Sequence, residues 1–141
     1  MVRQANVSRY RESEPPKEGE NRKIRRQGPI YSEEEVLELL AQPGPPPVQA
    51  WTQDCLKNMQ DLGLDSDDLP ALVRQAVQTG RYKGSEWCQN RANGPWAACD
   101  AYTVVRHEWN DVVARDVETS YYLKFGISAT GTVVLMVSCH L

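Results

Sequence analysis

Alternating and continuous apolar positions near the end of the chain predict a β-hairpin. In residues 121–127, every second side chain is large and apolar, so one face of this strand is expected to be buried. Residues 133–137 are apolar at every position, which indicates a central strand covered on both faces. Between them, the polar run 128–131 ends in a glycine and is typical of a hairpin turn.

Apolar residues at helical spacing predict three helices in the first part of the chain. The first helix begins at Ser32, a capping residue followed by three glutamates, and the proline-rich run 43–47 ends it. A second helix is expected from about Gln49 to Leu62, and a third begins at Asp65 or Ser66 and ends at Gly80.

Aromatic and β-branched residues dominate the chain from residue 81 onward and predict strands. We place these strands near residues 82–89, 98–108, 112–125 and 132–139. Helices followed by strands predict an α+β fold, in which the N-terminal helices pack on one face of an antiparallel sheet. Residues 31–141 are expected to form this single domain.

The first 30 residues differ from the rest in charge. They carry eight Lys or Arg and four Glu, a net charge of +4, which leaves −7 for the remainder of a chain of net charge −3. With few large apolar side chains, among them Ile24 and Ile30, residues 1–30 are expected to form a disordered basic tail. The basic cluster 22–26 would bind phosphates or an acidic partner, or remain solvated without one.

Cysteine spacing and hydropathy bear on the cellular compartment. The four cysteines show no CxxC pair, and the chain has no apolar run long enough to span a bilayer and no signal peptide pattern. We therefore expect reduced thiols, a cytoplasmic protein and no membrane partner.

Five short motifs follow one another in a recognisable order: Gly63-Leu64-Asp65, Tyr82-Lys83, Asp100-Ala101-Tyr102, Tyr122-Leu123-Lys124 and Val134 to Ser138. This order resembles the MqsR (motility quorum-sensing regulator) toxins over roughly residues 50–141. The resemblance implies a RelE-like fold and a metal-independent endoribonuclease, an mRNA interferase of a toxin–antitoxin pair. RNA and a cognate antitoxin protein are the partners that it implies.

The resemblance also implies site residues. Lys83 and Tyr122 match the catalytic lysine and tyrosine of the family. His140 stands where the family has a lysine, and Cys99 stands where it has a glutamine. We assign Lys83, Tyr122 and His140 to catalysis, and Arg106, Lys124, Tyr102 and Cys99 to substrate binding.

The chemistry of RNA cleavage supports these residue types. Without a metal, cleavage requires proton removal from a ribose 2′-OH, neutralisation of charge at phosphorus and protonation of the leaving oxygen. Histidine is suited to either proton transfer near neutral pH, so His140 is the candidate acid or base. Lys83, Lys124 or Arg106 would stabilise the phosphorane, and Tyr122 would donate a proton or stack on a base.

Other interpretations of the same residues remain open. Lys124 would simply face solvent, His140 would be a frayed end, and Tyr122 would be ordinary sheet packing. Cys99 would be a small buried hydrophobe. At the level of function, the alternative is a catalytically silent RNA- or protein-binding member of the same fold. A small metal or thiol protein is a third class, although no cysteine or histidine pair has suitable ligand spacing, and we expect no cofactor.

Overall fold

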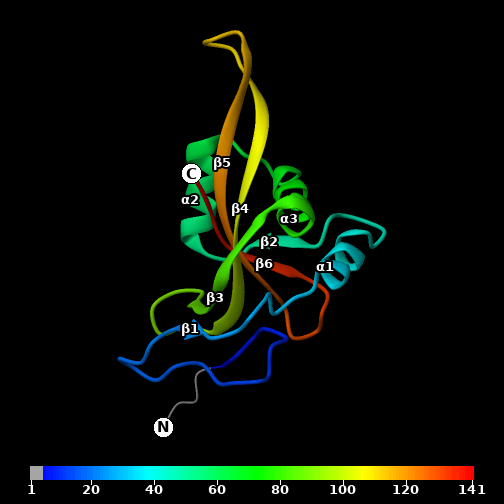
Figure 1. Cartoon of the computed structure of the whole chain (residues 1–141). Coiled ribbons are helices and arrows are strands. Elements are labelled where there is room, and N and C mark those ends of the chain that lie inside the picture. Colours follow the sequence, from blue (N-terminus) through cyan, green and yellow to red (C-terminus); the bar gives the residue numbers. More distant parts are fainter. Residues whose placement is uncertain (1–4) are drawn as a thin grey trace.

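The computed structural model describes residues 5–141 and shows an α+β fold with three helices and a mixed six-stranded sheet (Figure 1). The helices are α1 (Glu33–Leu40), α2 (Gln53–Leu62) and α3 (Asp68–Thr79). The strands are β1 (Lys23–Ile24), β2 (Val48–Ala50), β3 (Arg81–Gln89), β4 (Trp96–Asn110), β5 (Arg115–Ile127) and β6 (Val134–His140). Their order across the sheet is β1-β3-β4-β5-β6-β2.

The helices and the four long strands form where the sequence pattern predicts them. Ser32 caps α1 by accepting a hydrogen bond from the backbone nitrogen of Glu35 at 3.1 Å. Gly63 ends α2 in a left-handed conformation (φ 66°), which glycine adopts at low cost. The predicted central strand is confirmed, because β6 lies between β5 and β2.

The start of the second helix and the purely antiparallel sheet were predicted wrongly. Residues 48–50 form β2, which pairs in parallel with Val134–Met136 of β6, and α2 begins only at Gln53. The free edge of β6 favours the extended form, because it offers a ladder of hydrogen bonds to residues 48–50.

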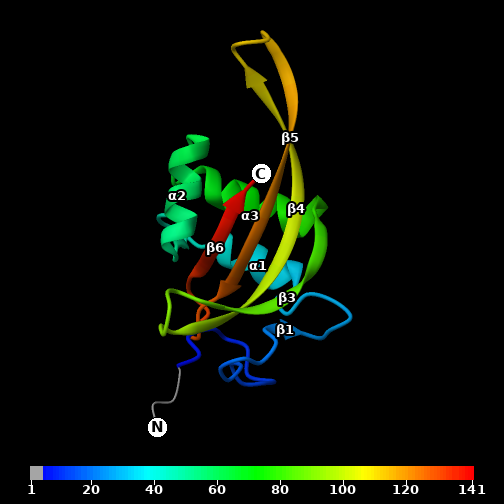
Figure 2. The ribbon, with the colours of Figure 1, turned by 90° about the vertical axis from the view of Figure 1, so that its left-hand side faces the viewer.

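The main core lies between the helices and one face of the sheet. Buried side chains of α1 and α3 pack with Tyr102, Val104, Leu123 and Phe125, and both helices lie on the same side of the sheet (Figure 1). Helix α2 lies along β6 (Figure 2), and its buried Cys55 joins the same core.

Side chains of helix α2 and its N-cap also bond to the backbone groups of β6 beyond the end of β2. The hydroxyl of Thr52 donates to the carbonyl of Val137 at 2.7 Å, and the backbone nitrogen of Cys139 donates to Asn58 Oδ1 at 3.1 Å. Polar side chains thus replace a missing strand along the edge, which would otherwise stay open to pairing with another chain.

Residues 5–30 do not form the disordered tail that the composition suggested. Tyr10 and Ile24 are buried and pack in a second apolar cluster with Trp87 and Trp96, and β1 pairs antiparallel with β3. Tyr10 also meets Trp87 edge-to-face, with ring centroids 5.6 Å apart. A few apolar contacts and a partner strand are therefore enough to order a segment that is otherwise polar. The expectation for residues 1–4 lies outside the described residues.

Residues 5–9 of this segment fill a split in the sheet. The β4–β5 ladder ends at the pair Asp100–Phe125, and beyond it the segment bonds to both strands. The fully buried Ser8 accepts a hydrogen bond from the backbone nitrogen of Ala98 at 2.9 Å. Gly126 is required beside the split, because a Cβ there would lie 2.5 Å from the carbonyl oxygen of Ala98.

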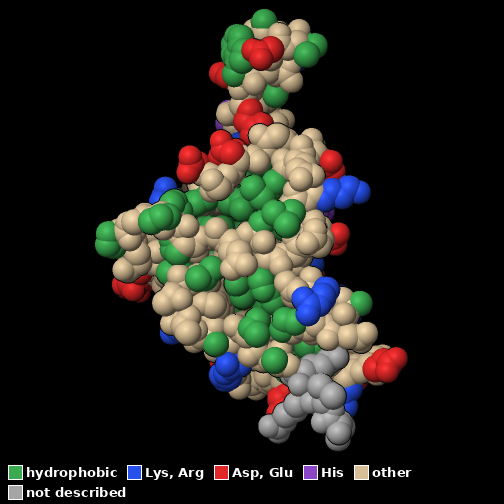
Figure 3. All heavy atoms as spheres, turned by 180° about the vertical axis from the view of Figure 1, so that it is seen from behind, with side chains coloured by type: hydrophobic (Ala, Val, Ile, Leu, Met, Phe, Trp, Pro, Cys, Tyr) green, Lys and Arg blue, Asp and Glu red, His purple; other side chains and the backbone are tan. Residues whose placement is uncertain are grey.

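Strands β4 and β5 continue beyond the body of the molecule as a long hairpin arm, defined here as residues 105–118 (Figure 1). The predicted strand start at residue 112 is wrong, because residues 111–114 form the turn. Trp109, Val112 and Val113 are exposed at the tip, with Val112 93% exposed, and Figure 3 shows hydrophobic side chains gathered there.

Candidate functional site on the open face of the sheet

Three of the seven predicted site residues, Tyr122, Lys124 and His140, meet on the face of the sheet opposite α1 and α3, which we call the open face. Two rows of paired residues cross it. Thr103, Tyr122 and His140 lie opposite one another on β4, β5 and β6, and Lys124 pairs with Ser138 in the next row. Directly paired residues of antiparallel strands point to the same face, so the register brings these side chains together.

Tyr122 and His140 form the centre of this site. Their rings stack with centroids 5.1 Å apart and an interplanar angle of 24°. Desolvation raises the pKa of the Tyr122 hydroxyl, so that it remains a proton donor at neutral pH. His140 is exposed and its Nδ1 lies 3.0 Å from the carbonyl oxygen of Leu141, whereas its Nε2 has no hydrogen-bond partner within residues 5–141.

Lys124 adds positive charge beside the two rings. Its ammonium lies 5.7 Å from the centre of the Tyr122 ring and forms an ion pair with Glu86 of β3. Burial is the largest single effect and acts to lower the pKa of Lys124, but the hydrogen bond to Glu86 and the charges of Cys88, Glu86 and Tyr122 together outweigh burial, and the pKa is raised. Lys124 is therefore a permanent cation. Sequence reasoning missed Glu86, because only the pairing of β3 with β4 brings it within reach.

Lys83 lies on β3, three strands away from His140 on β6. It is the extra residue of a bulge between Tyr82 and Gly84, is exposed, and has no hydrogen bond or ion pair within residues 5–141. Its strand, β3, is separated from β6 by β4 and β5, a distance of about 14 Å at the usual strand spacing. The structure therefore does not bring Lys83 together with His140.

Arg81 is a cation that the sequence analysis did not single out. It pairs with Thr103, which pairs with Tyr122, so Arg81 extends the row that ends at His140. Its signal in the sequence is its place at the start of the strand, two residues before Lys83.

Two predicted substrate-binding residues lie on the wrong face. Tyr102 belongs to the core under the helices, where it is 5% exposed and its ring stacks on Phe125. Arg106 lies on the same side and contacts Asp68 of α3 and Glu108, each at 3.7 Å. Strand alternation explains both, because even-numbered residues of β4 point to the helices.

Cys99 has the correct parity but cannot reach a substrate. It is fully buried in a small apolar cluster on the open-face side, beneath Trp51 and Val7. The interpretation of Cys99 as a small buried hydrophobe therefore describes its position, and the assignment to substrate binding is wrong.

Two cavities adjoin these elements. One, of about 520 Å³, opens beside Lys124 and is also lined by Arg22, Glu86, Cys88 and Ser138. We call it the open-face cavity.

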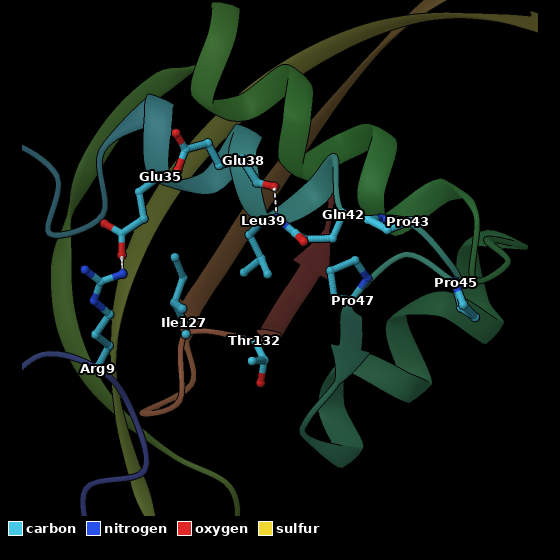
Figure 4. A pocket seen from close by; sticks show the side chains of 11 residues that line it. Arg9, Glu35, Glu38, Leu39, Gln42, Pro43, Pro45, Pro47, Ile127 and Thr132 are labelled. Atoms are coloured by element: carbon cyan, nitrogen blue, oxygen red, sulfur yellow. Dashed lines mark hydrogen bonds and ion pairs between the residues drawn. The ribbon is translucent and has the colours of Figure 1, made fainter.

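The other cavity, of about 430 Å³, lies between α1, the proline-rich loop and the turn after Ile127 (Figure 4). There Arg9 of the N-terminal segment forms an ion pair with Glu35 of α1, and Leu39 and Thr132 line the wall. Its lining contains no predicted site residue and no cysteine, histidine or lysine.

Within residues 5–141, no group of three or more His, Cys, Asp or Glu side chains is arranged to hold a metal ion. In the same part of the chain, no helix is both long enough and apolar enough to cross a membrane.

Comparison with known proteins gives no match. No family model, no curated protein sequence and no solved structure is significantly similar to this chain. The site must therefore be interpreted from its own geometry.

Proposed function

We propose that the chain is a metal-independent endoribonuclease that cleaves RNA on the open face of its sheet, similar to the MqsR toxins and with a RelE-like arrangement of its elements. The observation that carries this proposal is the stacked pair of Tyr122 and His140 with Lys124 beside it. This places a proton-transfer group, a proton donor and a cation at one point of an exposed surface.

Each group has a role in cleavage. His140 exchanges a proton with the ribose 2′-OH or the leaving 5′-oxygen through its free Nε2. Tyr122 remains protonated and donates a hydrogen bond to a phosphate oxygen. Lys124 stabilises the charge that develops at phosphorus, while Lys83 and Arg81 hold the neighbouring phosphates across the sheet.

A second candidate is RNA or protein binding without cleavage. Two observations favour it. Glu86 already neutralises Lys124, and the position of the glutamine found in the MqsR toxins is held by Cys99, which is fully buried. In either case the resemblance implies a protein antitoxin as partner, and the apolar tip of the arm offers such a partner a contact surface.

The test is cleavage of end-labelled RNAs, structured and unstructured, in the presence of a chelator. The wild-type protein should cleave, and His140→Ala and Tyr122→Phe should each lower the rate by about 10²–10⁴-fold, as expected for loss of a proton-transfer group. The melting temperature of His140→Ala should not change, because the side chain is exposed.

The matched control is His107→Ala, which removes the second histidine of the chain, exposed on the arm. This variant should cleave at the wild-type rate. RNA binding without cleavage by the wild-type protein would support the second candidate instead, and full activity of His140→Ala would disprove the assigned mechanism.

A further inference from the structure

The open-face cavity has the size and lining of a small-ligand site. Its volume of about 520 Å³ lies within the range of about 300–1,000 Å³ that is usual for such sites. Arg22, Arg91 and Lys124 line it together with Asp54 and Glu86, so cations exceed anions by one. An anionic ligand is therefore favoured over a cationic one.

Cys88 is a nucleophile in the wall of this cavity. All four cysteines are free and buried, but Cys88 is 7% exposed, whereas Cys55, Cys99 and Cys139 are 0% exposed. Cys88 lines the open-face cavity, whereas Cys55, Cys99 and Cys139 do not. Strand β3 holds it on the open-face side, in the same cluster as Cys99.

The surroundings of Cys88 favour its thiolate. The neighbouring Cys99 thiol, with help from the charges of Lys124 and Arg22, lowers the pKa of Cys88 against the opposing effects of burial and Glu86. Burial raises the pKa of Cys55 to about 11 and that of Cys139 to about 12, and burial also raises the pKa of Cys99. The other three thiols therefore stay protonated.

We propose that Cys88 is a thiol-exchange site for small anionic disulfides, of which glutathione disulfide is the physiological type. The Cys88 thiolate attacks one sulfur of the disulfide, a bond forms between the two sulfur atoms, and the second half leaves as a thiolate. No further oxidant is needed. The adduct fills the open-face cavity, with its carboxylates next to Arg22 and Lys124. This inference does not depend on ribonuclease activity.

The test uses the folded full-length protein and the dianionic disulfide 5,5′-dithiobis(2-nitrobenzoate), whose released thiolate is coloured, with peptide mass mapping of the product. One thiol, Cys88, should react at least about tenfold faster than the other three, which act as internal controls. The rate should rise with a midpoint below about pH 8.5, the ordinary cysteine value. Glutathione disulfide should then give a mixed disulfide on the same peptide.

Variants that remove a cation from the cavity test whether it selects anionic disulfides or merely leaves Cys88 accessible to any disulfide. Lys124→Met and Arg22→Met should each slow the anionic probe by about threefold or more, while changing the rate with the neutral probe 4,4′-dithiodipyridine much less. The matched control, Arg74→Met, removes an exposed cation from α3, on the other side of the sheet, and should change neither rate.

Three outcomes would overturn the proposal. The first is that all four thiols react at one slow rate, or only as fast as the protein unfolds. The second is that the fast site maps to a cysteine other than Cys88. The third is that Lys124→Met slows the neutral and the anionic probe equally, because the cavity would then not select an anion.

Discussion

At the scale of single residues, Asp100 connects the N-terminal segment to the sheet. Its fully buried carboxylate accepts hydrogen bonds from the backbone nitrogens of Ile30 and Tyr31, each at 3.0 Å, and from the hydroxyl of Ser85 at 2.6 Å. Tyr82 extends this network through Ser85. A buried carboxylate is tolerated there because three donors meet it.

Replacing Asp100 with Asn should destabilise the protein by about 1–3 kcal/mol near neutral pH, because an amide NH₂ then faces one of the backbone donors. The free energy of unfolding in urea measures this cost. Asp61→Asn, an exposed change on α2, is the control and should have almost no effect.

The same variant gives a test of pH dependence. Desolvation raises the pKa of Asp100 above its ordinary value of 3.8, although the three donors oppose it. A carboxyl whose pKa is higher in the folded protein contributes stability that is present below the unfolded pKa and is lost as the pH rises through the folded pKa. The stability difference between wild type and Asp100→Asn should therefore be largest below the ordinary pKa of 3.8 and decrease as the pH rises through the raised pKa of the folded protein. A difference that grows with pH would contradict the raised pKa.

At the scale of elements, the N-terminal segment acts as part of the sheet. It fills the split between β4 and β5 and covers Trp87 and Trp96 with Tyr10. Local composition favours disorder for this segment. Its few apolar and hydroxyl side chains nevertheless find complementary groups about 60–120 residues further along the chain.

Deleting residues 1–28 should therefore destabilise the domain, contrary to what the composition alone suggests. Losing the burial of Tyr10 and Ile24 costs about 1.5–3 kcal/mol for each side chain. The deletion also exposes Trp87 and Trp96, which adds to the loss of stability. Thermal unfolding of the truncated and full-length proteins measures the effect. Tyr10→Ala should reproduce part of the loss, and an unchanged melting temperature of the truncated protein would show that the segment packs too weakly to matter.

At the scale of the whole molecule, the arm and the body have different tasks. The body holds the core and the open face, whereas the tip of the arm presents Trp109, Val112 and Val113 to solvent. Residues 105–118 carry four acidic and two basic side chains. This balance disfavours contact with phosphate backbones and supports the proposal that the tip contacts a protein partner.

The double variant Val112→Ser, Val113→Ser should change the free energy of unfolding by no more than about 0.5 kcal/mol, because both side chains are exposed. Val104→Ser, in the buried part of β4, is the matched control and should cost several times more. A large loss from the tip variant would mean that the arm folds back onto the body.

The sequence by itself determined the elements. Helix caps and stops, alternating apolar residues and the hairpin turn depend on neighbours within a few positions, so the three helices and four long strands could be predicted from local chemistry. The same alternation correctly assigned Tyr122 and Lys124 to one face of their strand and Leu123 to the other.

Only the tertiary structure decided the pairing of distant segments. Strand β2, the ordered N-terminal segment and the Lys124–Glu86 ion pair all join residues more than 35 positions apart. The composition of a short segment does not reveal whether a distant part of the chain provides a strand edge or an opposite charge that pairs with it. The face of β4 was decided in the same way, because register placed Tyr102 and Arg106 beneath the helices and left Thr103 beside Tyr122 and His140.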